Sequence, residues 1–146
     1  MSAKLPPVTF GGRYLGVAVL VAAQVLIGLV HVVFGFWMLA APRFENLGFF
    51  SNAYLSVDIY SVYTVVFGVL SLVFSVGLWL QMRWGWVGTS VVLVFVVVAD
   101  SLTLLDLPSV PGIPKFAGYG EITYSVIGLS YLLQSHIRAK YGIQVL

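Results

Sequence analysis

Four long apolar runs dominate the chain, and each is bounded by proline, glycine or charged residues. A helix needs roughly 20 mainly apolar residues to cross a hydrocarbon core of about 30 Å. The runs that meet this requirement cover residues 14–41, 59–81, 86–105 and 121–137. The pattern therefore predicts four membrane-spanning helices. The second and third runs are joined by so few residues that we expect them to be antiparallel neighbours.

The valine-rich stretch 91–98 is the part of these runs most typical of a β-strand. An isolated strand in lipid would leave its backbone N–H and C=O groups without partners, whereas a helix pairs them internally. We therefore predict an all-α fold, an integral membrane four-helix bundle that forms a single domain over residues 1–146. Between the first two runs, residues 44–58 mix aromatic and polar side chains. This segment is either a short interfacial helix or an aromatic-rich loop over the bundle.

Composition agrees with a membrane location. Only 8% of the residues are charged, whereas soluble domains carry roughly 25%. The positive-inside rule then gives the orientation, with both termini in the cytoplasm. That face carries Lys4, Arg13, Arg83, Arg138 and Lys140, and the outer face carries Arg43 and Lys115. Trp37 marks the outer interface, and the interface anchors on the cytoplasmic side are Trp79, Trp84 and Trp86. We expect a multi-pass protein of the cell membrane.

Small and hydroxyl-bearing residues recur at helical spacing within the first, second and fourth runs. In lipid, hydrophobic burial draws helices together only weakly, so small residues that permit close approach are the packing signal. We interpret these positions as helix-packing seams or, alternatively, as the lining of a polar pathway. The packing positions are Gly28, Gly35, Thr64, Gly68, Ser71, Ser75 and Gly128.

His31 and Asp100 are the ionisable residues deepest within the predicted spans. At about 1.5 Å per residue, they lie roughly 25 Å and 21 Å from the cytoplasmic ends of their spans, so both fall in the outer half. We expect His31 to be the partner of Asp100, with Gln24, Ser101 and Thr103 as further candidates. Three interpretations stay open: a structural hydrogen-bonded clasp, an Asp100 within reach of outer water, and a proton relay or ion site.

Several chemistries lack the residues that they need. Cysteine is absent, which excludes disulfides, thiolate metal sites and cysteine nucleophiles. His31 and His136 differ in depth by more than one helical turn, so they cannot share a haem iron. The chain has no metal-binding histidine motif, nucleophile elbow, P-loop or dinucleotide-binding glycine motif. We therefore predict no metal, no cofactor and no catalytic residues, and the scattered basic residues predict no nucleic-acid binding.

Three local features carry a resemblance. The second run ends in Gly77-Leu78-Trp79, a basic and aromatic turn follows at residues 83–86, and Tyr131-Leu132-Leu133 leads through Arg138 to Tyr141-Gly142. In these features the last three runs resemble a loose group of uncharacterised four-helix membrane proteins of archaea and bacteria. The resemblance implies a fold and no activity.

Our first functional hypothesis is a non-catalytic accessory or scaffold subunit of a larger membrane complex, for example a respiratory one. The alternative is a small oligomeric transporter, channel or proton-conducting protein that uses His31 and Asp100. A third hypothesis is a membrane-embedded enzyme whose interfacial Tyr and Trp side chains stack on a quinone or lipid. The expected partners are the lipid bilayer and either other membrane subunits or further copies of the chain.

Overall fold

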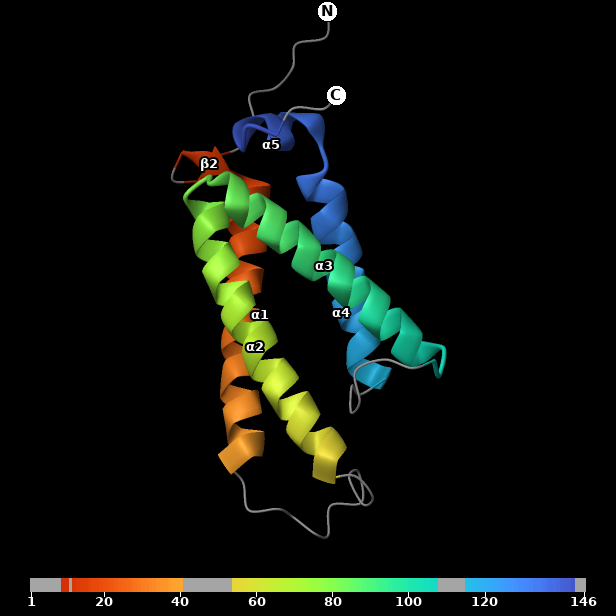
Figure 1. Ribbon diagram of the computed structural model, residues 1–146. Helices are drawn as coiled ribbons and strands as arrows, with labels where there is room; N and C mark the ends of the chain where they lie inside the picture. The colour runs from red at the N-terminus through yellow and green to blue at the C-terminus, as the bar shows by residue number, and fades with distance from the viewer. Residues whose placement is uncertain (1–8, 11, 41–53, 108–114, 144–146) are drawn as a thin grey trace, which may run out of the picture.

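The computed structural model describes residues 9–10, 12–40, 54–107 and 115–143, and this part of the chain is mostly helical (Figure 1). A two-stranded antiparallel hairpin precedes the first helix, and its turn contains Gly12 at a φ of 73°. In chain order the elements are β1 (Thr9–Phe10), β2 (Arg13–Tyr14), α1 (Leu15–Ala40), α2 (Tyr54–Trp79), α3 (Arg83–Leu104), α4 (Lys115–Leu132) and α5 (Ser135–Lys140).

Three of the described helices are long and apolar enough to cross a membrane. They are α1, the part of α2 from Ile59 onward, and α3, whose mean hydropathies are 2.6, 2.1 and 2.1. Their outward-facing side chains are almost all aliphatic or aromatic, which suits contact with lipid tails. These features indicate a membrane protein.

The fourth predicted run differs from the structure at both ends. Instead of one helix over 121–137, α4 begins at Lys115 and ends at Leu132, and the short helix α5 follows. Gln134 separates the two helices because its backbone is extended, with φ −62° and ψ 137°. The second helix also begins earlier than predicted, at Tyr54, so it takes in the end of the segment 44–58. The remainder of that segment lies outside the described residues.

The helices pack mainly as neighbours in sequence: α1 against α2, α2 against α3, and α3 against α4 (Figure 1). The turn between α2 and α3 is tight, with Gln81 in the left-handed region at a φ of 58° and the Met82 N–H donating to the Gly77 carbonyl at 2.9 Å. The prediction that these two helices are antiparallel neighbours is confirmed. The hairpin and α5, which are the first and last described elements and so mark the end nearest the termini, lie at one end of the helices (Figure 1).

Glycine lets the backbones of α1 and α2 approach each other closely. A Cβ atom added at Gly68 would lie 2.7 Å from the carbonyl oxygen of Gly28, and one added at Gly35 would lie 3.0 Å from that of Ser61. On α2 the neighbouring Thr64, Ser71 and Ser75 are also buried. The Thr64 and Ser75 hydroxyls donate to carbonyls of their own helix, at 2.7 Å in each case. These two hydroxyls are therefore satisfied without a ligand. Gly128 of α4 lies against Leu93 and Leu20, 3.1 and 3.2 Å from its added Cβ.

At the end that carries the termini, an apolar cluster is combined with side chains that cap helix ends. Three side-chain donors bond carbonyls at the ends of α2 and α4: Tyr141 Oη to Leu78 O at 2.8 Å, Arg13 Nε to Trp79 O at 2.7 Å, and Trp86 Nε1 to Leu132 O at 3.0 Å. Such terminal carbonyls have no partner within their own helix. Burial raises the pKa of Tyr141 to about 12, so its hydroxyl keeps the proton that it donates.

Replacement of Gly68 by alanine tests the close approach of α1 and α2. The added methyl group would press on the backbone of Gly28 and Val32, and we expect Gly68→Ala to destabilise the protein by about 1–3 kcal/mol. Thermal unfolding in detergent measures the change. The matched control is Gly120→Ala, because a Cβ at Gly120 meets nothing within 4 Å. Equal unfolding temperatures for the two variants would contradict this account of the α1–α2 contact.

Candidate functional site

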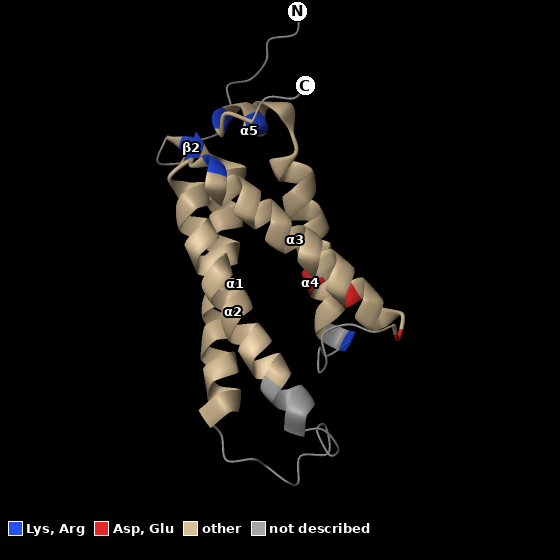
Figure 2. Ribbon diagram, viewed as in Figure 1, with Lys and Arg blue, Asp and Glu red and all other residues tan. Residues whose placement is uncertain are grey.

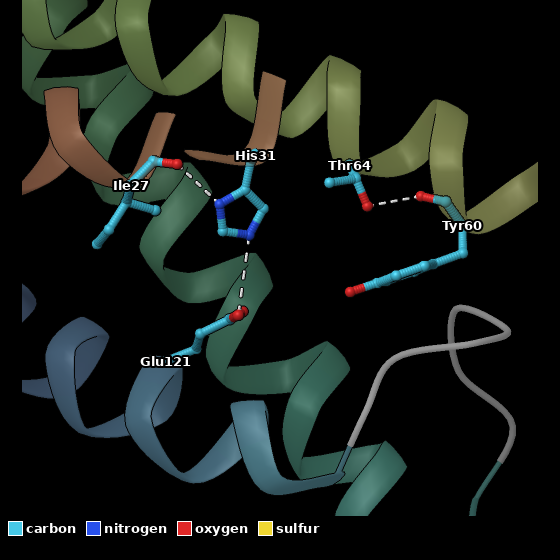
Figure 3. Close-up of polar contacts among 5 residues, drawn as sticks. All are labelled: Ile27, His31, Tyr60, Thr64 and Glu121. Carbon is cyan, nitrogen blue, oxygen red and sulfur yellow. Dashed lines mark hydrogen bonds and ion pairs between the residues drawn. The ribbon is translucent and has the colours of Figure 1, made fainter. Parts of the chain in front are cut away.

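Ionisable side chains from three helices gather in the half of the molecule away from the chain ends. They are His31 of α1, Asp100 of α3 and Glu121 of α4, and Figure 2 shows the two acidic positions on neighbouring helices. His31 Nε2 lies 3.8 Å from Glu121 Oε1 (Figure 3). The opposite ring nitrogen of His31 is 2.8 Å from the Ile27 carbonyl one turn earlier, and as an N–H it donates to that carbonyl. That bond orients the imidazole so that its free nitrogen faces Glu121.

Asp100 is the most unusual member of this group. Its side chain is fully buried, and neither carboxylate oxygen has a hydrogen-bond partner among the described residues. It packs against α4 at Gly118, where an added Cβ would lie 3.4 Å from the Asp100 Cβ. The charged groups that act on it are those of Glu121 and His31. An ionisable residue placed in this way inside a membrane is expensive and marks a candidate functional site.

Aromatic side chains of α2 enclose the same region. The His31 ring lies 4.8 Å from that of Phe67, and the Tyr63 ring stacks on Phe67 at 6.0 Å and on Tyr60 at 6.2 Å between ring centroids. The hydroxyl end of Tyr60 is turned toward His31 and Glu121 (Figure 3). Helix α2 therefore supplies an apolar wall with phenol groups at its edge.

The other candidate partners of Asp100 make contacts with other residues. Gln24 and Thr89 approach each other, with 3.3 Å between the Gln24 Nε2 and the Thr89 Oγ1 atoms, and both residues are buried. The Thr103 hydroxyl donates to the Ala99 carbonyl of its own helix at 3.0 Å. No described hydrogen bond joins Gln24, Ser101, Thr103 or His31 to Asp100. Its closest ionisable neighbours are instead Glu121, whose side chain interacts with that of Asp100, and His31.

A cavity begins at Glu121 and reaches Gln24. It offers about 20 Å³ to the centre of a water molecule, which is enough to hold one. The residues that line it are Gln24, Ser71, Glu121, Tyr124 and Ser125, together with Ile27, Phe67, Val92, Leu93 and Val96, and its wall is almost entirely apolar. The hydroxyls of Tyr124 and Ser125 are buried without a hydrogen-bond partner in the described structure. Buried polar groups of this kind are commonly satisfied by internal water.

Sequence reasoning missed the position of Glu121 beside His31. It placed this residue at the outer end of a span beginning at 121, whereas α4 begins at Lys115 and carries Glu121 in its second turn, beside His31. The signal that could have found it is Pro114: no proline follows it before α4 ends, so a helix could begin directly after it.

The tryptophans lie at two ends of the helices. Trp37 is exposed near the end of α1 and stacks on Phe34, with 5.8 Å between ring centroids. Trp79 and Trp84 lie at the opposite end, beside the α2–α3 turn. Trp86 is near them but is half-buried, and it caps α4 through its bond to Leu132.

His136 is also at the end that carries the termini, far from His31, and its ring packs edge-on against Tyr14 at 5.5 Å between centroids. Over the described ranges, no group of three or more His, Asp or Glu side chains is arranged to hold a metal ion. Comparison of the chain with protein-family models, with curated proteins and with solved structures finds no significant match.

The stability of an Asp100→Asn variant separates a functional carboxylate from a structural clasp. If the carboxyl group of Asp100 does not hold the helices together, we expect Asp100→Asn to change the free energy of unfolding by at most about 1 kcal/mol at neutral pH. Thermal unfolding in detergent measures this difference. Asp106→Asn is the control, since Asp106 is an exposed acid paired with Lys115, and we expect a change within about 0.5 kcal/mol. A marked loss of stability in Asp100→Asn would indicate a clasp instead.

Proposed function

We propose that this chain is a small proton-conducting or proton-coupled transport protein of the membrane. The observation that carries the proposal is the fully buried carboxyl group of Asp100 beside Glu121 and His31. Carboxyl and imidazole groups are the side chains that proton pathways in membranes use. Two neighbouring carboxyl groups in a medium of low polarity commonly share one proton, and a nearby histidine can deliver or accept it.

The three groups form an ordered route from the surface to the interior. The side chains of His31 and Glu121 are 18% and 30% exposed, whereas Asp100 is 0% exposed. In the proposed mechanism, a proton from the outer side reaches the His31–Glu121 pair first and passes from Glu121 to Asp100. The carboxyl oxygen that loses the proton becomes the acceptor for the next one. Each step moves a proton between oxygen or nitrogen atoms and needs no other reactant.

The cavity beside Glu121 supports a continuation toward the termini. Glu121 and Gln24 both line this largely apolar cavity, so a water molecule in it would extend the route from Glu121 toward the Gln24–Thr89 pair. Beyond this point the described helices offer hydroxyl groups but no buried carboxyl group. The inner half of the route would therefore depend on water and hydroxyls.

The proposal includes a four-helix bundle with α4 as its fourth span and both termini in the cytoplasm. Packing of α4 against α3 supports this arrangement, since Glu121 then faces protein and not lipid. The distribution of basic residues supports the orientation, with Arg13, Arg83, Arg138 and Lys140 at the end that carries the termini (Figure 2). The proposed location is the cell membrane.

The absence of cysteine makes this topology simple to test. We expect a membrane-impermeant maleimide added to intact cells to label Leu107→Cys, at the end of α3 far from the termini. Lys140→Cys should react only after the membrane is opened. Both positions are exposed, so a difference in labelling reports the side of the membrane. Labelling of Lys140→Cys in intact cells would reverse the proposed orientation.

Proton flux through the purified chain tests the function itself. The chain is reconstituted into liposomes that contain a pH-sensitive dye, and a potassium diffusion potential drives proton entry. We expect Asp100→Asn and Glu121→Gln each to lower the initial rate by about tenfold or more, because each removes a group that carries the proton.

Asp106→Asn is the matched control for flux. It also removes a carboxylate at the outer end, but one that is exposed and paired with Lys115, so the rate should stay that of the unchanged chain. No flux above empty liposomes, or equal rates for the Asp100 and Asp106 variants, would contradict the proposed function.

An accessory or scaffold subunit is the second candidate, and the outer face of α4 favours it. This face exposes Gly120, Thr123 and Ser130 beside the larger Tyr119, Val126 and Ile127. Small and polar residues on a membrane helix are typical of contacts with another helix. Purification in mild detergent distinguishes the candidates: further subunits at fixed stoichiometry favour the accessory role, and a homo-oligomer with proton flux favours transport.

A further inference from the structure

The cavity beside Glu121 is matched in size to a single small ion or molecule. It is lined by residues of α1, α2, α3 and α4, and its volume of about 20 Å³ for the centre of a water molecule leaves room for one such occupant. Glu121 is the acidic residue in its wall, and Phe67 contributes an aromatic ring. Most of the wall is apolar. A ligand held here must therefore be water-sized and must tolerate a site with little other water.

The carboxyl groups at this cavity give it a negative charge balance. The side chain of Glu121 interacts with that of Asp100, and two carboxyl groups that share one proton keep one negative charge. A neutral His31 leaves that charge uncompensated. Lys115, a basic residue at the same end of the molecule, is paired with Asp106. The site therefore favours a monovalent cation.

Hydrogen-bond acceptors at the cavity suit an ion that carries N–H donors. Ser125 and Tyr124 of α4 line it, and their hydroxyl oxygens are buried without a hydrogen-bond partner in the described structure. Ser125 is 0% exposed. Together with the Glu121 carboxylate and the face of the Phe67 ring, these hydroxyls make four groups that can receive a positively polarised N–H. An ammonium ion has four such N–H groups and is close to a water molecule in size.

We propose that this cavity binds an ammonium ion, and we call it the ammonium site. Its apolar wall selects against alkali-metal cations, because a metal ion would lose its hydration there without replacement. Ammonium can instead pass one proton to the Glu121 carboxylate: one N–H bond breaks, one O–H bond forms, and neutral ammonia and a neutral carboxyl group remain. This inference rests on the proposed function, since the proton then continues to Asp100, and it names ammonium as a substrate of the same route.

Thermal unfolding of the full chain in detergent tests the ammonium site without any transport step. Ammonium chloride is compared with potassium chloride at equal pH and ionic strength, because the two cations have nearly the same radius but potassium carries no N–H group. We expect ammonium at tenfold its dissociation constant to raise the unfolding temperature by about 3–5 °C over potassium. Methylammonium is larger than the cavity, so its affinity should be about tenfold lower.

Variants of α4 test which side chains hold the ion. Ser125→Ala should weaken ammonium binding about tenfold, because it removes a hydrogen bond to a charged ligand. Ser130→Ala is the matched control, since Ser130 is exposed on the same helix, and it should bind as the unchanged chain does. Glu121→Gln removes the negative charge from the wall and should abolish the difference between ammonium and potassium. Circular dichroism establishes that the helices are retained, and Ser125→Ala keeps the test decisive if Glu121→Gln does not fold.

Equal unfolding temperatures in ammonium and potassium would overturn the proposal. So would equal ammonium affinities for Ser125→Ala and Ser130→Ala, or equal affinities of the unchanged chain for methylammonium and ammonium. The liposome flux assay separates this failure from a failure of the proposed function. Proton flux without selective ammonium binding refutes the ammonium site alone. Selective ammonium binding without proton flux supports the site and refutes the transport function.

Discussion

The buried carboxyl group of Asp100 is the constraint that the surrounding helices have to satisfy. An ionisable side chain without a hydrogen-bond partner is expensive in an apolar interior, and it persists only where the rest of the fold determines its position. Here the contact of α3 with α4 determines it, because Gly118 of α4 packs against Asp100 and Glu121 follows within one turn. Helices α3 and α4 must therefore gain their stability from contacts elsewhere along their length.

That stability is concentrated at the opposite end. There the carbonyls that close α2 and α4 receive bonds from Tyr141, Arg13 and Trp86, and Leu78, Leu132 and Ile137 are fully buried. One end of the molecule is thus well packed, with its helix ends satisfied, and the other holds the unsatisfied carboxyl group. A local conflict of this kind is expected at a functional site.

The sequence predicted α1, α2 and α3 to within a few residues, because a helix in lipid must be long and apolar and both properties are visible in hydropathy. It did not predict where α4 begins and ends, since Lys115 and Glu121 lower the hydropathy of its first turns. Its end at Leu132 is capped by the side chain of Trp86, which is distant in sequence. The short hairpin before α1 was also missed, as its two-residue strands carry too little pattern.

The positions of His31 and Asp100 along their helices were enough to predict that the two residues lie at similar depth. Which side chains meet depends in addition on the rotation of each helix about its axis. With α4 beginning at Lys115, Glu121 turns toward His31 and lies between the two helix pairs, α1 with α2 and α3 with α4. The 3.8 Å between His31 and Glu121 is longer than a hydrogen bond, and an approach of roughly 1 Å would make one. Proton transfer through this pair would therefore depend on how closely the two helix pairs approach each other.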